Sequence, residues 1–208
     1  MDVLVKILSA ATELFIQYGF KVITMDDIAR RAGISKKTLY QHFANKNEVV
    51  QEAVTWYKAS ITKRCHNEMV NSDNPIEALV RCMSVLDSFH RKVNTQTLVE
   101  LARFYPECFY YFKNTLLSED VEYIKENMVA GIKEGLYRPE INPEFMAKYR
   151  IELSLLIFNP NLLVNDRFSL SLVALDIAEH FLYGIMTEKG VTLYKKYKEQ
   201  YLQKVSEL

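Results

Sequence analysis

The chain has 208 residues, 49% hydrophobic and 25% charged, and its formal net charge at pH 7 is zero. This balance is ordinary for a globular protein, and with only five prolines and six glycines a turn-rich all-β chain is a poor fit. No run of about 18 apolar residues occurs, which argues against a membrane span, and the first residues, MDVLVKILSAATELF, do not resemble a signal peptide.

The first two predicted helices lie close together near the N-terminus. Apolar residues at helical spacing predict a first helix that ends at Gly19. Thr24 is expected to cap a second helix, because Asp27 stands three residues later in a capping-box-like pair. Gly33 ends that helix.

Two more helices follow, one short and one long. Ser35 is the natural N-cap of a helix from Lys36 to about Phe43. Asn45, with Glu48 three residues later, is expected to cap a helix that runs to about residue 71.

The remainder of the chain also predicts helices. The cluster NSDNP at 71–75 is the clearest break, and Pro75 suits the first position of a fifth helix. Ser118 and Gly190 are among the expected boundaries, and Pro106 is a candidate break. The further helices are expected over 95–117, 119–134, 143–158 and 169–188, with a last one within 191–208.

Residues 24–46, TMDDIARRAGISKKTLYQHFANK, predict a helix-turn-helix. Ala29 is small enough for two helices to cross closely, and Gly33 permits the tight turn between them. Leu39 and Phe43, four residues apart, turn the apolar side of the second helix inward. A helical hairpin that merely packs is the alternative.

The polar side chains of this segment are candidates for DNA contact. Lys can donate to guanine and Gln can pair with adenine, whereas Thr, Tyr and Lys commonly bind phosphates. The helix N-termini at Thr24 and Lys46 also suit phosphate oxygens. The DNA-binding candidates are Thr24, Ser35, Lys36, Lys37, Thr38, Tyr40, Gln41, His42 and Lys46.

The distribution of charge agrees with this interpretation. Residues 1–64 contain ten Lys or Arg and six Asp or Glu, whereas the rest contain sixteen and twenty. A modestly basic module on an acidic body is typical of a DNA-binding head joined to a sensor, although chance explains the charges about equally well.

The segments ILSAATELFIQYGF and TMDDIARRAGISKKTLYQHFANKNEVV resemble the tetracycline-repressor (TetR) family over roughly the first 55 residues. Lys37 departs from the family, which often has a small residue there, so operator preference cannot be copied from a relative. For His42 the resemblance implies a phosphate contact. The matching positions are Thr24, Ile28-Ala29, Ala32-Gly33, Ser35, Leu39-Tyr40, His42-Phe43 and Lys46.

The resemblance implies an all-α fold with a three-helix head, a variable ligand domain and a homodimer formed through the last two large helices. We therefore expect a DNA-binding domain over residues 1–48, joined by the helix 46–71, and a ligand-binding and dimerisation domain over 49–208. Ligand binding would alter the separation of the two heads and release a double-stranded DNA operator.

Aromatic residues are dense between positions 89 and 123, at about twice the chain-wide 12%. Aromatic walls with a few polar groups favour a pocket for an apolar ligand, although an aromatic stripe is more often plain core. The ligand-binding candidates are Arg81, Phe89, His90, Phe104, Phe109, Phe112 and Tyr123.

Two apolar helix faces near the C-terminus are expected to form the dimer, or else internal core. One head alone buries too little surface for tight, specific DNA binding. The dimer candidates are Tyr149, Leu153, Leu156, Leu175, Phe181, Leu182 and Ile185.

Cysteine usage argues against structural cross-links. Cys65, Cys82 and Cys108 are an odd number, widely spaced, with no CxxC pair or Cys/His cluster. They predict neither a disulfide framework nor a zinc site and fit a reducing compartment. We expect a cytoplasmic protein with no metal, cofactor or membrane partner.

The sequence therefore predicts a DNA-binding transcriptional regulator, most simply a repressor released by a small, largely apolar or aromatic effector. Three alternatives stay open. They are an activator or co-repressor-dependent regulator of the same fold, a protein-interaction module without effector, and an enzyme, for which no catalytic constellation appears.

Overall fold

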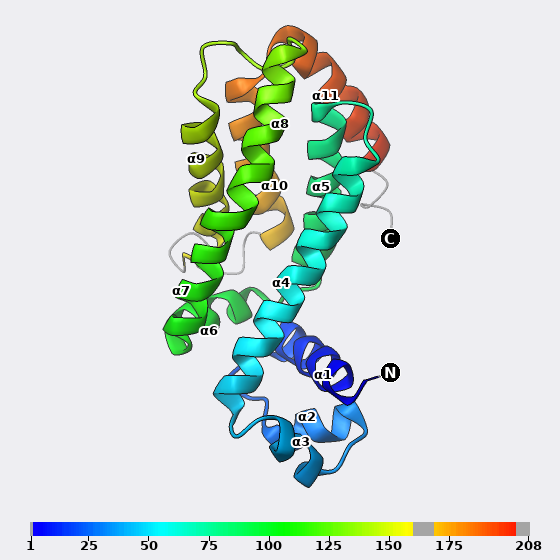
Figure 1. The fold of residues 1–208 in the computed structure, drawn as a ribbon, viewed down its shortest axis with the longest axis vertical. Helices are drawn as coiled ribbons and strands as arrows, with labels where there is room; N and C mark the ends of the chain where they lie inside the picture. The colour runs from blue at the N-terminus through cyan, green and yellow to red at the C-terminus, as the bar shows by residue number, and fades with distance from the viewer. Residues whose placement is uncertain (1, 160–168, 203–208) are drawn as a thin grey trace. The chain divides into compact units, whose positions relative to one another are not determined.

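The computed structural model describes residues 2–159 and 169–202, and these are helical throughout apart from their connections. The expected all-α fold is confirmed (Figure 1). The chain divides into two compact units, one of residues 1–60 with 92–113 and one of 61–91 with 114–208. Within the described ranges, no helix combines the length and apolar character that crossing a bilayer requires.

The smaller unit contains the predicted helix-turn-helix. Buried apolar side chains of α1 and α2, among them Ile7 and Ile28, form its core together with Leu39 of α3. The unit also includes a later segment of the chain, so the compact units do not follow a single cut near residue 48. Its helices are α1 (Val3–Tyr18), α2 (Met25–Ala32), α3 (Lys36–His42), the first part of α4 (Lys46–Val70), α6 (Thr95–Phe104) and most of α7 (Pro106–Thr115).

Local capping explains where the first helices begin and end. Thr24 and Asp27 form a full capping box, because each side chain accepts a hydrogen bond from the other residue's backbone N–H. Gly33 ends α2 in the left-handed conformation, with φ +67°. Both expectations are confirmed.

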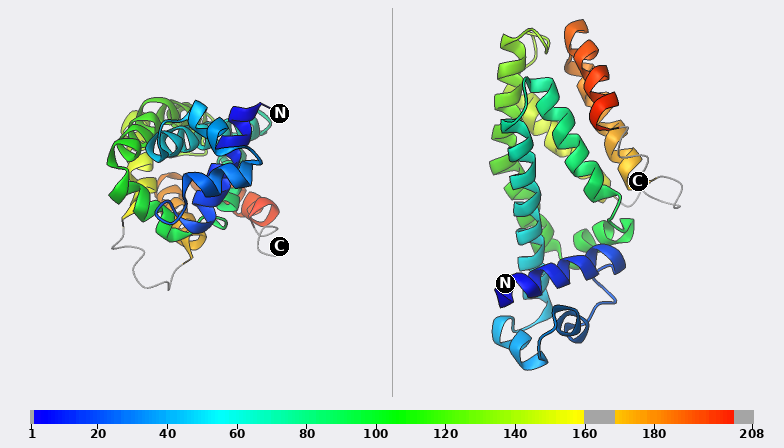
Figure 2. Two further views of the ribbon diagram at one scale, coloured as in Figure 1. Left: turned by 90° about the horizontal axis from the view of Figure 1, so that it is seen from below. Right: turned by 90° about the vertical axis from the view of Figure 1, so that its right-hand side faces the viewer.

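The larger unit is a bundle of long helices in which α8 packs along α9, and α11 packs along α5 (Figures 1 and 2). An isolated β-bridge pairs Tyr137 with Met186, and the side chain of Tyr137 is fully buried. The helices are the rest of α4, α5 (Pro75–His90), α8 (Val121–Lys133), α9 (Pro143–Leu155), α10 (Leu170–Ile185) and α11 (Glu188–Tyr201), with a π-helical turn at Leu116–Asp120 and a 3-10 turn at Leu156–Phe158.

Two predicted helix boundaries differ in detail from the structure. Ser118 does lie at the junction of α7 and α8, but the junction is a π-helical turn, in which the Ser118 hydroxyl donates to Thr115 O, and not an open break. Gly190 lies inside α11, where its N–H donates to the capping hydroxyl of Thr187. A Cβ at Gly190 would lie 2.2 Å from Leu136 O, so the glycine serves close packing.

Candidate nucleic-acid interface

Helix α3 presents one apolar side to the core of the smaller unit and its other sides to solvent. Leu39 is fully buried and Phe43, at the end of the helix, is 4% exposed. These two anchors hold the helix in place, as the sequence predicted. Of the polar candidates on α3, Thr38 is half-buried and the exposed ones are Lys36, Lys37, Tyr40, Gln41 and His42.

The N-terminus of α3 is organised by two hydroxyl groups. Ser35 Oγ accepts the backbone N–H of Thr38 at 3.0 Å, and the two side-chain oxygens lie 2.8 Å apart. This cap fixes the first turn of α3, in which Lys36 and Lys37 stand. Ser35 therefore acts here as a positioning residue, and its own exposed hydroxyl is still within reach of solvent.

The two lysines of this turn differ in their surroundings. Lys36 Nζ lies 2.6 Å from Asp26 Oδ2 at the start of α2, and the hydrogen bond to that carboxylate raises the pKa of Lys36. Lys37 makes no ion pair with any residue that the structure describes. The positive charge of Lys37 is therefore less compensated than that of Lys36. A phosphate that binds Lys37 does not have to compete with a carboxylate of the protein, whereas at Lys36 it would compete with Asp26.

The start of α2 is less open to phosphate than the sequence suggested. The Thr24 hydroxyl donates to Asp27 Oδ2 at 2.6 Å, and this bond is the main reason that the pKa of Asp27 is lowered. Asp26 and Asp27 place two carboxylates in the first helical turn. They oppose an approaching phosphate, so Thr24 is first a capping residue.

The side chain of Lys46 is directed into the smaller unit. Its Nζ donates to the carbonyl oxygen of Phe20, and burial lowers the pKa of this lysine. Asn45 Oδ1 caps the Glu48 N–H at 3.1 Å. The Lys46 side chain is therefore already engaged within its own unit, and its contact with a phosphate stays a prediction.

Helix α6 contributes residues that the sequence reasoning missed. Glu100 is 6% exposed, and its carboxylate accepts the backbone N–H of Lys21 at 2.9 Å. Thr97 donates its hydroxyl to Phe15 O, also at 2.9 Å. Both contacts hold the end of α1 and the loop that leads into α2. The signal available in the sequence was a single acid, Glu100, between two inward-facing leucines of the same helix, Leu98 and Leu101.

The predicted ligand-binding residues do not gather within one unit. Phe104, Phe109 and Phe112 belong to the smaller unit, whereas Arg81, Phe89, His90 and Tyr123 belong to the larger one. Phe104 and Tyr123 are 48% and 38% exposed.

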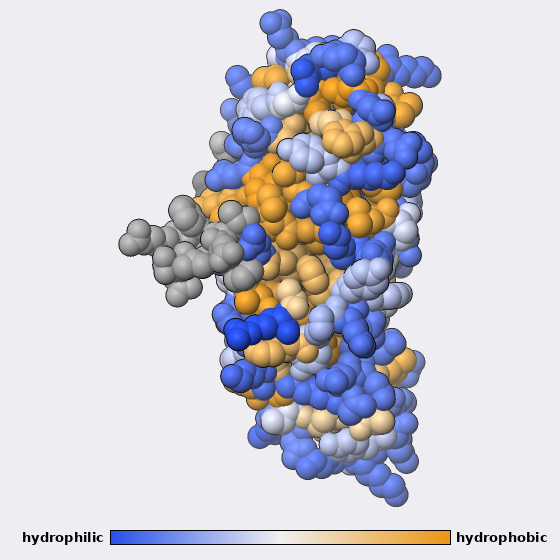
Figure 3. Space-filling view, turned by 90° about the vertical axis from the view of Figure 1, so that its left-hand side faces the viewer, coloured by the Kyte–Doolittle hydropathy of each residue, from blue (hydrophilic) through white to orange (hydrophobic). Residues whose placement is uncertain are grey.

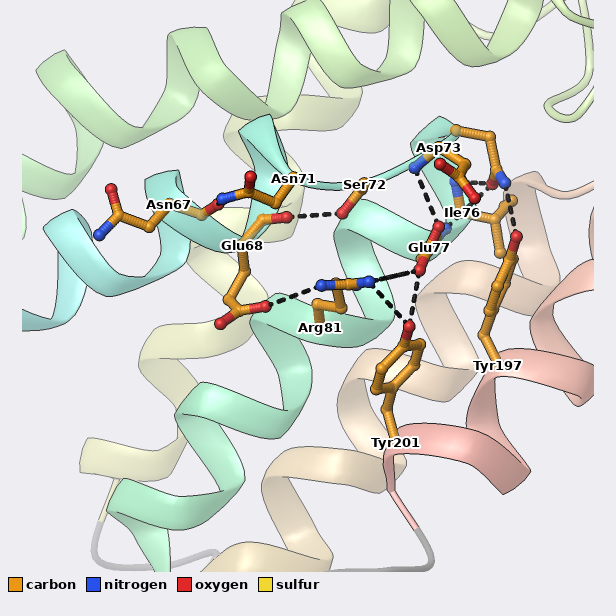
Figure 4. Close-up of polar contacts among 11 residues, drawn as sticks. Asn67, Glu68, Asn71, Ser72, Asp73, Ile76, Glu77, Arg81, Tyr197 and Tyr201 are labelled. Carbon is orange, nitrogen blue, oxygen red and sulfur yellow. Dashed lines mark hydrogen bonds and ion pairs between the residues drawn. The ribbon is translucent and has the colours of Figure 1, made fainter.

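Arg81 is engaged in a polar network that joins α4, α5 and α11 (Figure 4). Its guanidinium lies 2.8 Å from Glu77 Oε1, 3.3 Å from Glu68 Oε2 and 2.8 Å from the Tyr201 hydroxyl. The hydrogen bond to Glu77 chiefly raises the pKa of Arg81. Arg81 therefore links α11 to α5, and its expected role as a ligand-orienting residue stays a prediction.

His90 lies at the end of α5, half-buried, with its ring centroid 5.3 Å from that of Phe89. Burial removes water from the imidazole and lowers its pKa to about 4. The ring is therefore neutral at physiological pH and can donate one hydrogen bond and accept one.

The predicted dimer residues separate into surface and core. Tyr149 and Leu156 are 44% and 36% exposed on the α9 side, where Figure 3 shows apolar side chains gathered. Leu153 and Leu175 are partly buried against the core. Three further candidates are 4% exposed or less and lie in the core of their own chain, which is the alternative that the sequence left open for these faces: Phe181, Leu182 and Ile185.

Known proteins resemble the chain over its head and over most of its length. A family model described as bacterial regulatory proteins, tetR family, matches residues 7–53. The chain is 31% identical over 161 residues to the uncharacterized HTH-type transcriptional regulator YhgD of Bacillus subtilis, across 74% of this chain and 81% of that protein.

Two further relatives carry functional names. The HTH-type transcriptional repressor KstR2 of Mycobacterium tuberculosis is 25% identical over 153 residues, across 69% of this chain and 74% of its own. Its structure matches with a TM-score of 0.56 at 21% identity, covering 90% and 96% of the two chains, which shows a shared fold. The HTH-type transcriptional activator FasR of Mycolicibacterium smegmatis is 50% identical over 44 residues, 21% of this chain and 20% of that protein.

Proposed function

The chain belongs to the TetR family of bacterial transcriptional regulators, and from that premise we propose that it is a repressor released from its operator by a small effector. Residues 1–48 would bind DNA, with α4 as the connection, and 49–208 would bind the effector and a second copy of the chain. The regulator would act in the cytoplasm, where bacterial chromosomal DNA lies.

The observation that carries this proposal is the exposed polar side of α3. Lys37, Tyr40 and Gln41 project from a seven-residue helix that Leu39 and Phe43 hold from beneath. A recognition helix needs such a rigid base, because base contacts depend on register in the major groove. Gln41 offers a bidentate partner for adenine, and Lys37 offers a donor for guanine or phosphate.

A homodimer through α9 and α10 would supply the second recognition helix. Large apolar side chains are exposed on these helices, and an apolar surface of this kind on a protein without a partner is unusual. Phe145 and Tyr149 are stacked with centroids 6.1 Å apart. The exposed residues that would meet the second copy are Phe145, Tyr149, Leu156, Leu172 and Tyr183.

Repression is favoured over activation by the relative with the longer match. KstR2, a named repressor, aligns over 153 residues, whereas the activator FasR aligns over 44. The short match covers little more than a DNA-binding head, which activators and repressors can share. The effector is expected to be largely apolar or aromatic, given the aromatic side chains of the ligand domain.

A mobility-shift assay on the DNA upstream of the chain's own gene tests the proposal. We expect retardation that specific competitor DNA removes and random DNA does not. A transcription assay from the same DNA should then show lower output with the protein present. Higher output would favour the activator, and no preference over random DNA would reject both.

A further inference from the structure

Arg150 on α9 holds a positive charge without an internal counter-ion. Its side chain is half-buried, and burial lowers the pKa of the guanidinium to about 10, which leaves it charged at neutral pH. In the described parts of the chain it makes neither an ion pair nor a hydrogen bond. A charge that is partly removed from water and has no partner is unfavourable, so the position requires an explanation.

Three acids on α5, α9 and α10 already have partners of their own. Asp87 of α5 is 1% exposed and binds Arg91 Nε at 2.8 Å as well as the Ser171 hydroxyl. Glu179 of α10 pairs with Lys198. Glu144 of α9 itself binds Lys148 at 2.9 Å. None of these three carboxylates is free to neutralise Arg150.

Two rings lie beside the guanidinium of Arg150. Its Cζ lies 5.9 Å from the ring centroid of Phe181, so the guanidinium rests over an aromatic face. His90 is close enough for the charge of Arg150 to help keep its imidazole neutral. The site thus combines one cation with one neutral hydrogen-bonding ring, and the buried Phe181 ring supports the guanidinium from one side.

We propose that Arg150 binds the carboxylate of the effector, which would be an amphipathic organic acid with an apolar or aromatic body. A planar guanidinium pairs with a carboxylate through two parallel hydrogen bonds, and this geometry selects a carboxylate over a neutral group of equal size. His90 would donate to the same group or to its neighbour. The inference rests on the proposed effector function and specifies the class of effector.

Calorimetry on the full-length protein tests this with matched probes: decanoate against decanamide, and 4-phenylbutyrate against 4-phenylbutyramide. We expect at least one acid to bind the unmodified protein about tenfold or more tightly than its amide. Arg150→Met should abolish that preference, and Arg150→Lys should retain part of it. Lys148→Met removes a positive charge from the same helix, exposed and paired, and should leave the preference unchanged.

Melting temperature and oligomeric state distinguish a ligand-binding role of Arg150 from a structural one. Without ligand, Arg150→Met should melt at the same temperature as the unmodified protein or higher, because an unpaired charge has been removed. A lower melting temperature for both Arg150→Met and Arg150→Lys would overturn the proposal in favour of a packing role. Dissociation of a dimer of either variant in sedimentation would overturn it in favour of an intersubunit role. Equal affinity for acid and amide, no binding of either acid, or a preference that survives Arg150→Met would also overturn it.

Operator release is measured separately in the mobility-shift assay. If an acid binds in an Arg150-dependent manner but does not free the DNA, the proposed effector mechanism fails and the carboxylate site stands. If amides and acids free the DNA with equal potency, the mechanism stands and the carboxylate site fails.

Discussion

The backbone N–H of Lys21 donates to the carboxylate of Glu100 at 2.9 Å, although the two residues are 79 positions apart. The bond ties the loop between α1 and α2 to α6, and Glu100 is 6% exposed at this position. Helix α6 is therefore a structural part of the DNA-binding head. A displacement of α6 would be transmitted directly to the segment that leads into the helix-turn-helix.

Replacement of Glu100 should loosen the head. Glu100→Ala leaves the Lys21 N–H without its acceptor, and we expect a loss of about 1–3 kcal/mol in the free energy of unfolding. Glu100→Gln keeps a side-chain oxygen in place and should lose less. Urea denaturation checks both, and equal stability of Glu100→Ala and the unmodified protein would contradict the assigned role.

Gly19 and Gly33 form a matched pair for backbone strain. Both have positive φ, +83° and +67°, but a Cβ at Gly19 would lie 2.8 Å from Glu100 Oε2, whereas a Cβ at Gly33 meets nothing within 4 Å. Each alanine variant should lose about 1–2 kcal/mol through the backbone alone. Gly19→Ala should lose more, because it also displaces Glu100. Thermal unfolding that ranks Gly33→Ala as the less stable variant would refute this explanation.

Lys37→Ala should weaken operator binding through the loss of one unpaired charge. If Lys37 touches phosphate alone, the slope of log affinity against log salt concentration should fall by about one unit. Titrations followed by fluorescence anisotropy at several salt concentrations measure this slope. As a control, Lys148→Ala removes one positive charge from α9 and should leave the slope unchanged. An unaltered slope with a changed sequence preference would instead assign Lys37 to base recognition.

Tyr201→Phe should weaken the attachment of α11. The Tyr201 hydroxyl donates to Glu77 Oε1 at 2.7 Å and accepts from Arg81 Nη2 at 2.8 Å (Figure 4). Its removal should lower the free energy of unfolding by about 1 kcal/mol. Tyr183→Phe, at a tyrosine that is 47% exposed, is the control and should be nearly neutral. Equal effects of the two variants in denaturant titrations would contradict the importance of the network.

Features governed by neighbours in sequence could be predicted. The capping box of Thr24 and Asp27, the left-handed Gly33 and the start of α5 at Pro75 all depend on residues within one helical turn. The face of α3 followed from the same local reasoning, since the spacing of Leu39 and Phe43 determines which side is buried. These contacts form over short separations, so periodicity and capping rules suffice.

Features governed by distant contacts could not be predicted. In the sequence, Gly190 looks like the end of a helix. The structure shows instead that Leu136 O leaves no room for a side chain at this position. Phe181 and Ile185 look equally suited to a dimer surface or to a core, and only the packed bundle places them inside. Arg81 looked free to meet a ligand because its partner Tyr201 lies 120 positions away. The hydrogen bond from Lys21 N–H to Glu100 could not be predicted either, because the two residues are 79 positions apart.

Selection of bound fragments from genomic DNA, followed by footprinting, tests most directly whether α3 reads an operator as part of a dimer. We predict one enriched sequence with two symmetry-related half-sites, read by helices about 34–36 Å apart. A variant with Lys37, Tyr40 and Gln41 all changed to alanine should fold normally and lose this preference while retaining weak non-specific binding. No enriched sequence, or an unchanged footprint for the triple variant, would contradict the account.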